Sequence, residues 1–257
     1  QQLIDLQRQY RGRFLTSRFG GKDRYATSLL MADQVYTGDS AVWTVTTGKT
    51  FPDALAAVAA RGSISQTIRR GPLLLVNGTS SAPPAAVVKA INRTANATTR
   101  VVGGPGVVSA GIERALPRAT RYAGADRYGT AAVLNSSVYS EATTAYLVTG
   151  RNFPDALAVS AVAGLREAPL YVVPPSCVPS YVLADLEYLG VTDVRIVGGQ
   201  SVLGAGVARL QPCPDPAWLV ELNAARGAVG THPLAEDPGI SGGLAAHIAY
   251  NTAHGRS

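Results

Sequence analysis

Two aspartates stand in a duplicated motif and are the first candidates for acid–base chemistry. The pentapeptide FPDAL occurs twice, each time after a glycine and a basic residue, and it places carboxylates at Asp53 and Asp155. The proline before each aspartate is typical of the first turn of a helix, where a negative charge is stabilised and the pKa of a carboxyl group is lowered. A general acid needs a raised pKa instead. We therefore expect both aspartates to anchor helix starts and to have no catalytic role.

A basic residue precedes each of these helices, Lys49 in the first copy and Arg151 in the second. Both follow a short apolar strand, and open α/β sheets bind ligands at the carboxyl ends of their strands. A cation there could contact an anionic ligand, although the neighbouring aspartate already occupies the position where a helix start would bind a phosphate. A structural role is therefore favoured for the motif, and anion binding for the basic residue before it.

A second duplicated motif, DRY, occupies residues 23–25 and 126–128 and is expected to open the first helix of each copy. An arginine beside a tyrosine suits a phosphorylated or acidic sugar polymer. A structural role is favoured instead: a buried Asp–Arg pair would hold the helix against the sheet, whereas a surface pair would contribute little. The candidate anion contacts in and beside the two motifs are Arg18, Arg24, Lys49, Arg121, Arg127 and Arg151. The candidate structural carboxylates are Asp23, Asp53, Asp126 and Asp155.

Glycine pairs follow a strand in each copy, at Gly103-Gly104 and at Gly198-Gly199. They do not give the G-x-G-x-x-G spacing of a dinucleotide site, and no acidic residue is well placed for a ribose, so tight turns explain them and no cofactor is expected. Nucleophilic catalysis is equally disfavoured, because neither copy contains a histidine and no G-x-S-x-G or S-x-x-K motif occurs. We expect the repeats to be non-catalytic and to hold no metal.

Four motifs recur in the same order in both halves of the chain, which indicates a duplicated domain. RFGGKDRYAT at 18–27 matches RYAGADRYGT at 121–130, and GPLLLV at 71–76 matches APLYVV at 168–173. The spacing between equivalent residues falls along the chain because the loops of the second copy are shorter. We divide the chain into an N-terminal segment (1–17), a first repeat (18–117), a second repeat (118–210), a Pro-rich linker (211–217) and a helical tail (218–257).

Each repeat alternates between the hydrophobic periods of helices and strands. In the second, an Ala- and Leu-rich helix at 154–165 follows a β-branched strand at 143–150 and precedes the apolar run PLYVVP at 169–174. Such runs form buried parallel strands, and their alternation with helices indicates βαβ units. We predict an α/β fold of two tandem Rossmann-like modules, each a small parallel sheet flanked by helices.

Positive charge is concentrated in the first half of the chain. The net charge is +6, and residues 1–120 hold 15 Lys and Arg against 6 Asp and Glu. This favours an anionic partner, with a merely solubilising basic face as the alternative. The basic residues are scattered without interleaved aromatic residues, so nucleic acid is not expected, and no apolar run is long enough to span a membrane.

Both cysteines, Cys177 and Cys213, lie in proline-rich loops. Exposed loop thiols are a liability inside cells and no metal-ligand spacing is present, so a disulfide in an oxidising compartment is favoured over two free thiols. The N-terminus shows no signal peptide, which also fits a secreted chain that has already been processed.

The four motifs together, RxxGxDRYxT, GxxFPDALA, PLLL(V) and VVGG, resemble the type 2 cell-wall-binding repeat family of Gram-positive surface proteins. The resemblance covers residues 18–117 and 121–210. It implies a secreted protein attached non-covalently to the cell wall through an anionic polymer such as a teichoic-acid-like polysaccharide. That family usually has three repeats around a pseudo-threefold axis, and this sequence shows two. The resemblance thus suggests a homo-oligomer that associates through the face a third repeat would cover.

The tail resembles the first helices of the CAP (SCP-like) extracellular superfamily, in the pattern LNAAR…VG..PL..DP.IS..LAAHIA. His254 lies near the first cavity histidine of that superfamily, but the remaining ligands would fall beyond Ser257, so no metal site is expected. His232 is expected at the surface, and His247 is expected to be packed or to face solvent. We interpret the tail as a remnant, or as a sign that the chain is part of a longer protein.

Binding to the cell wall without catalysis is the function that these patterns favour. Two alternatives come from other classes: an α/β enzyme acting on a nucleotide or a sugar, and a structural surface-layer or adhesion protein. The histidine-free repeats and the broken glycine motif count against the enzyme.

Overall fold

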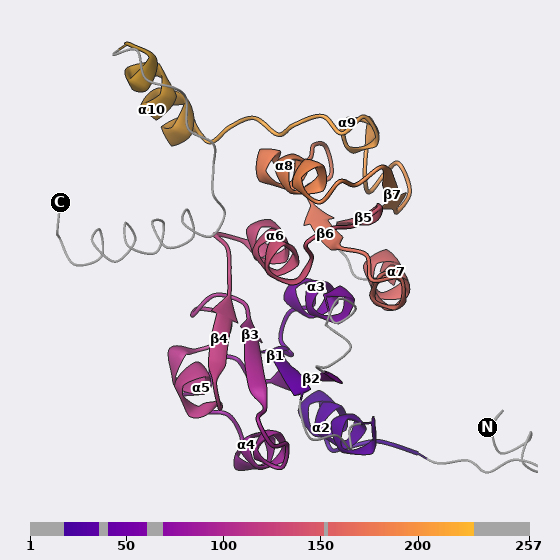
Figure 1. Cartoon of the computed structure of the whole chain (residues 1–257), viewed down its shortest axis with the longest axis vertical. Coiled ribbons are helices and arrows are strands. Elements are labelled where there is room, and N and C mark those ends of the chain that lie inside the picture. The colour runs from indigo at the N-terminus through magenta and orange to yellow at the C-terminus, as the bar shows by residue number, and fades with distance from the viewer. Residues whose placement is uncertain (1–17, 36–40, 61–68, 152–153, 229–257) are drawn as a thin grey trace, which may run out of the picture.

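The computed structural model describes residues 18–35, 41–60, 69–151 and 154–228, and the structural statements below concern these residues. They form two α/β modules side by side, each built on a parallel sheet with helices on its faces (Figure 1). The predicted fold class of two small parallel sheets flanked by helices is confirmed. The N-terminal segment 1–17 lies outside the described residues, as does the tail after residue 228 with its three histidines.

The first sheet consists of four parallel strands, β1 (Ala41–Thr47), β2 (Arg69–Val76), β3 (Thr98–Val102) and β4 (Ala119–Tyr122). Their order across the sheet is β2-β1-β3-β4. The edge strand β4 comes from the stretch that the sequence repeat assigns to the second copy, and its Tyr122 pairs with Val102 of β3. The second repeat, 118–210 by its motifs, therefore starts inside the sheet of the first.

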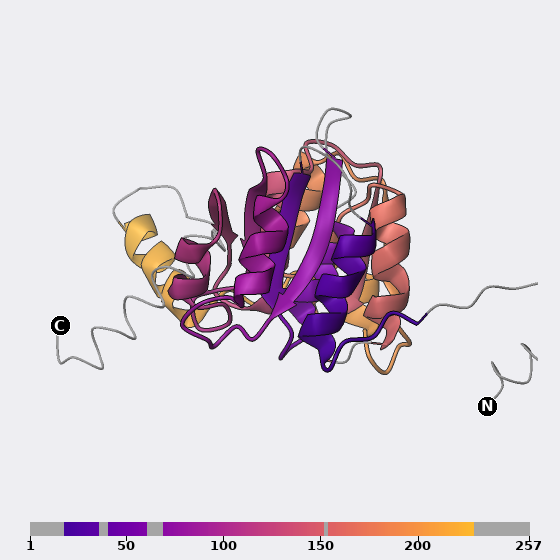
Figure 2. The same ribbon diagram turned by 90° about the horizontal axis from the view of Figure 1, so that it is seen from below.

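The helices of the first module divide between the two faces of this sheet (Figures 1 and 2). Three of them, α2 (Arg24–Val35), α4 (Ala85–Asn92) and α5 (Ala110–Ala115), pack with Trp43, Leu74 and Ile91 on one face. The fourth, α3 (Pro52–Ala59), lies on the opposite face and belongs to a different core cluster. The first sheet is thus a buried layer, which fits the β-branched and apolar composition of its strands.

The second sheet consists of β5 (Thr144–Thr149), β6 (Leu170–Val173) and β7 (Asp193–Val197), which are parallel and ordered β6-β5-β7. Its helices are α6 (Arg127–Val138), α7 (Pro154–Leu165), α8 (Ser180–Tyr188) and α9 (Ala205–Ala208). The α8 and α9 helices pack on one face, α7 packs on the other, and α6 contributes to both cores. All four residues of β6 are buried, as expected for a strand that is covered on both sides.

Helix α3 lies between the two modules, where it packs against α6 and α7 (Figure 1). The backbones come close: a Cβ added at Gly164 of α7 would stand 3.2 Å from the carbonyl oxygen of Val58. The hydroxyl of Tyr139, which follows α6, donates to the carbonyl oxygen of Ala59 at 2.9 Å. The FPDAL helices of the two copies therefore form the joint between the repeats.

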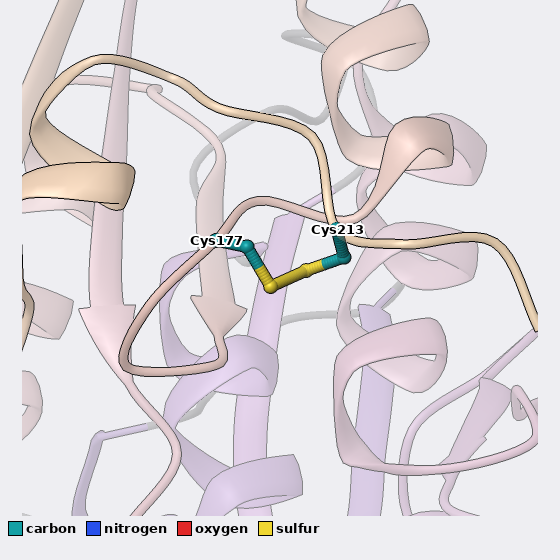
Figure 3. The surroundings of a disulfide bond; sticks show 2 residues. All are labelled: Cys177 and Cys213. Atoms are coloured by element: carbon teal, nitrogen blue, oxygen red, sulfur yellow. A yellow bond between two sulfur atoms is a disulfide. The ribbon is translucent and has the colours of Figure 1, made fainter.

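A disulfide joins Cys177 to Cys213, as the sequence favours (Figure 3). It ties the loop after β6 to the proline-rich segment that precedes α10 (Ala217–Ala228), and the backbone N–H of Cys213 donates to the carbonyl oxygen of Val178 beside it. Helix α10 stands apart from both sheets in Figure 1. No helix in the described part of the chain is both long and apolar enough to cross a membrane.

Candidate functional site

The aspartate of each DRY motif begins a helix. Asp126 Oδ1 accepts hydrogen bonds from the backbone N–H groups of Tyr128 and Gly129, and Asp23 Oδ1 accepts one from Ala26. These are the bonds of an N-cap residue, which satisfies N–H groups that have no partner inside the helix. The carboxylates therefore bind backbone, and within the described residues neither DRY motif contains the Asp–Arg pair considered from the sequence.

The arginine and tyrosine of each DRY motif hold the loop that precedes FPDAL. Arg24 Nη1 donates to the carbonyl oxygen of Gly48 at 2.8 Å, and Arg127 Nη1 donates to that of Gly150 at 2.7 Å. A Cβ at Gly48 would meet the Tyr25 ring at 2.6 Å. The glycine before each basic residue is therefore required by the close approach of the tyrosine ring, and one N–H of each arginine is committed to the fold.

The aspartate of FPDAL lies against the glycine pair at the end of the neighbouring strand. Gly103 has φ +116°, and a Cβ there would stand 2.9 Å from Asp53 Oδ2. Gly198 has φ +141°, and the corresponding distance to Asp155 Oδ2 is 3.4 Å. Only glycine combines this backbone conformation with so close a carboxylate. Two motifs far apart in the sequence are thus two sides of one contact, made once in each repeat.

The remaining basic candidates differ in how much of their charge is available. Arg121 is half-buried, pairs with Glu113 at 2.8 Å and donates to the carbonyl oxygen of Gly103 at 2.5 Å, so it is held by the fold. Arg18 and Arg151 are exposed, and neither side chain bonds to another described residue. Lys49 is exposed, and its Nζ donates to Thr79 Oγ1 at 2.7 Å.

A cavity of about 570 Å³ opens at the joint between the repeats, and we call it the junction cavity. It brings together Lys49 and Arg127 as cations and Asp53 and Asp126 as carboxylates. The first repeat supplies the loop before α3 and the loop after β3, and the second repeat supplies the start of α6. The complete lining is residues 49–53, 104–107, 124–127 and Thr130. The cavity therefore exists only where one repeat is followed by the next.

Burial changes the chemistry of Asp53. Its exposed fraction is 6%, and this burial raises its pKa to about 6, against the opposing effect of the Arg127 charge. The expectation that a helix start lowers this pKa is therefore wrong for Asp53, because desolvation outweighs the helix terminus. The group therefore changes charge near pH 6 inside the junction cavity.

The junction cavity has binding groups but few catalytic ones. Lys49 and Arg127 can donate to an anion, and the two carboxylates can accept hydrogen bonds from hydroxyl groups. Asp126 is already committed as a helix cap, and no histidine or cysteine lines the cavity. In the ranges that the structure describes, no three His, Cys, Asp or Glu side chains gather as metal ligands would.

The sequence did not single out two threonines that complete the DRY turn. Thr27 Oγ1 accepts from the N–H of Gly21 at 3.0 Å, and Thr130 Oγ1 accepts from that of Gly124 at 3.1 Å. The repeated final threonine of GxDRYxT was the available signal. The loop 104–107 closes one side of the junction cavity, and the repeated glycine pair pointed to its first residue, Gly104. Pro105 and Gly106 carried no signal, because the second copy has Gln200 and Ser201 there.

The raised pKa of Asp53 predicts in which direction the free energy of unfolding changes with pH. Its folded-state pKa of about 6 lies above the ordinary value of 3.8, so the folded protein binds the proton more tightly. Protonation of Asp53 therefore stabilises the folded protein by up to about 3 kcal/mol. This stabilisation is fully present below about pH 4 and is lost as pH rises through 6. We expect the free energy of unfolding of wild type, relative to Asp53→Asn, to fall by that order between pH 4 and pH 7 in denaturant titrations. Asp155→Asn, at the more exposed equivalent position, is the matched control, and parallel curves for wild type and Asp53→Asn would contradict the assignment.

Comparisons with known proteins agree with this architecture. The model of a protein family described as Cell wall binding domain 2 (CWB2) matches residues 18–113 and 121–208. The N-acetylmuramoyl-L-alanine amidase LytC of Bacillus subtilis (strain 168) is 29% identical over 187 residues, which are 72% of this chain and 33% of that protein. The chain therefore spans about a third of that relative.

Two solved structures from Clostridium difficile share the fold. Cwp6 superposes with a TM-score of 0.62 at 21% identity, over 78% of this chain and 32% of its own. Cwp8 superposes with a TM-score of 0.64 at 22% identity, over 81% of this chain and 35% of its own. The family match ends at residue 208, so the likeness of the tail to the CAP superfamily stays a prediction. The two matched segments coincide with the two repeats and cover most of the sequence, and the chain belongs to the Cell wall binding domain 2 family.

Proposed function

We propose that the two repeats bind the bacterial cell wall and hold a secreted protein at the cell surface through an anionic wall polymer. The observation that carries this proposal is the junction cavity, in which Lys49 and Arg127 from successive repeats line one hollow. Membership of a cell-wall-binding family supports the same function and the same cell-wall location. The binding is non-covalent and needs no catalysis.

The chemistry of the junction cavity fits a unit that has both an anionic group and hydroxyls. Lys49, at the rim, offers an ammonium group that is already turned toward a neighbouring loop, and Arg127 keeps further N–H donors beyond the one bound to Gly150. Asp53 and Asp126 would repel a bare phosphate, but they accept hydrogen bonds from sugar or polyol hydroxyls. A phosphorylated or acidic polysaccharide, such as a teichoic-acid-like polymer, satisfies both requirements.

An enzyme acting on a nucleotide or a sugar is the weaker alternative. Asp53 has the raised pKa of a general acid, but no histidine or cysteine lines the junction cavity and its second carboxylate caps a helix. The match to the amidase covers a third of that protein, so the activity in its name is not transferred to these repeats.

Removing the charge of Lys49 tests the role of the junction cavity. Lys49→Ala should weaken retention on purified Gram-positive cell walls roughly tenfold at low salt, because one charge-assisted hydrogen bond is lost. Arg151→Ala should act in the same direction, and both variants should keep the wild-type melting temperature because the side chains are exposed. Lys89→Ala, an exposed lysine on α4, is the matched control and should bind as wild type. Equal retention of Lys49→Ala and Lys89→Ala would refute the assignment.

We also propose that the chain self-associates through the open face of α7. Leu157, Val162 and Leu165 on this face are 58%, 41% and 81% exposed. The equivalents of the first two in α3 are Leu55 and Ala60, which are buried at the joint between the repeats. The same helix face is therefore covered in the first repeat and uncovered in the second.

Light scattering at micromolar concentration should show a dimer or a trimer if this face is an interface. Leu157→Glu together with Leu165→Glu should return the protein to a monomer, because a charge buried in an apolar contact is costly. A wild-type protein that is monomeric throughout would overturn the self-association proposal while leaving wall binding untouched.

A further inference from the structure

A second hollow, of about 490 Å³, lies on the first repeat, and we call it the side hollow. It is formed where the start of α2 faces the loop after β2 and the start of α4. The side chains used below are Lys22, Asp23, Tyr25, Asn77, Pro83 and Pro84. None of them lines the junction cavity.

Lys49 connects the side hollow to the junction cavity. It lines the junction cavity, and its Nζ donates to Thr79 Oγ1 at 2.7 Å. The hydroxyl of Thr79 donates in turn to Asn77 Oδ1 at 3.1 Å, and Asn77 lines the side hollow. Both hollows lie at the carboxyl ends of the strands of the first sheet, so a chain-like ligand held at Lys49 has a hollow on either side of its anionic group.

The lining of the side hollow suits an uncharged sugar ring. Tyr25 is half-buried and is held in place by its close approach to Gly48, and the two prolines add rigid apolar surface. A pyranose presents C–H groups on its faces, which pack on such surfaces, and hydroxyls at its rim. Asp23 uses Oδ1 to cap α2 and Asn77 uses Oδ1 for Thr79, which leaves a carboxylate oxygen and an amide NH₂ for hydroxyls.

We propose that the side hollow is a second subsite, which binds an uncharged sugar residue of the wall polymer next to the anionic group at Lys49. This inference rests on the proposed wall-binding function and names the second chemical group of its ligand. Recognition then requires the two groups at a fixed spacing, so that the protein distinguishes a glycosylated anionic polymer from a bare polyphosphate.

The second repeat keeps the tyrosine and the aspartate of the DRY motif but not the lysine and the asparagine. Ala125 stands where the first repeat has Lys22, and Pro174 stands where it has Asn77. The loop after β6 is also tied to the C-terminal side of the module by the disulfide. The proposed sugar subsite is therefore a property of the first repeat, and Tyr128, the counterpart of Tyr25, provides a control inside the same molecule.

Retention on walls purified from a panel of Gram-positive bacteria, measured at low and at high salt, tests the inference. Tyr25→Leu and Asn77→Ala should each lower the affinity roughly three- to tenfold, and the factor should be the same at both salt concentrations because uncharged contacts are not screened. The effect of Lys49→Ala should shrink at high salt. Tyr128→Leu should stay within about twofold of wild type, since it makes the same change where the lysine and the asparagine of the side hollow have no counterpart.

The outcomes separate this inference from the proposed function. If the wild-type protein is retained on the walls and Tyr25→Leu and Asn77→Ala bind as well as it does, the sugar subsite is overturned and wall binding stands. An equal loss in Tyr128→Leu, or a loss in Tyr25→Leu that vanishes at high salt, also overturns it. No wild-type retention on any wall overturns both. Melting temperatures are measured for each variant, and if Tyr25→Leu unfolds, the exposed Asn77→Ala decides the matter alone.

Discussion

The burial of helix α3 between the two repeats is the contact on which the rest of the structure depends. Six of its eight residues are buried, and the close approach of Gly164 to Val58 leaves little space for a larger side chain at this crossing. Burying a single side chain such as Leu55 contributes about 1.5–3 kcal/mol, so the joint is a substantial part of the stability of a small module. The same contact fixes α6 beside the loop before α3, and this places Arg127 of one repeat across from Lys49 of the other.

Two copies of one motif have diverged because their surroundings differ. Asp53 is buried near Arg127 of the following repeat and has a pKa of about 6, whereas Asp155 occupies the same helix position and is only half-buried. Strand β4 belongs to the second copy by sequence but lies in the first sheet. It leaves only four residues between Tyr122 and the start of α6, and so holds the second repeat against the first. The junction cavity is thus a product of tandem arrangement, and a single repeat does not contain it.

Local features of the fold could be predicted from the sequence. The proline and aspartate of FPDAL mark helix starts at Pro52 and Pro154, and the alternation of apolar runs with helices gives the parallel sheets, because both follow from short-range chemistry. Features that depend on packing between the repeats could not be predicted from the sequence. The helix start was expected to lower the pKa of Asp53, but burial in the folded protein outweighs it and raises the pKa. The commitment of Arg24, Arg121 and Arg127 to carbonyl groups was likewise invisible, because a basic residue in a motif does not show what its N–H groups bind.

The dependence of wall binding on an anionic polymer can be measured most directly by stripping that polymer from purified cell walls while the peptidoglycan stays intact. The protein is incubated with untreated and with stripped walls at equal mass, and the bound fraction is measured after centrifugation. We expect most of the protein to sediment with untreated walls, and the bound fraction to fall to the background level on stripped walls. Retention that is unchanged by stripping would contradict binding through the polymer and would place the ligand in the peptidoglycan itself.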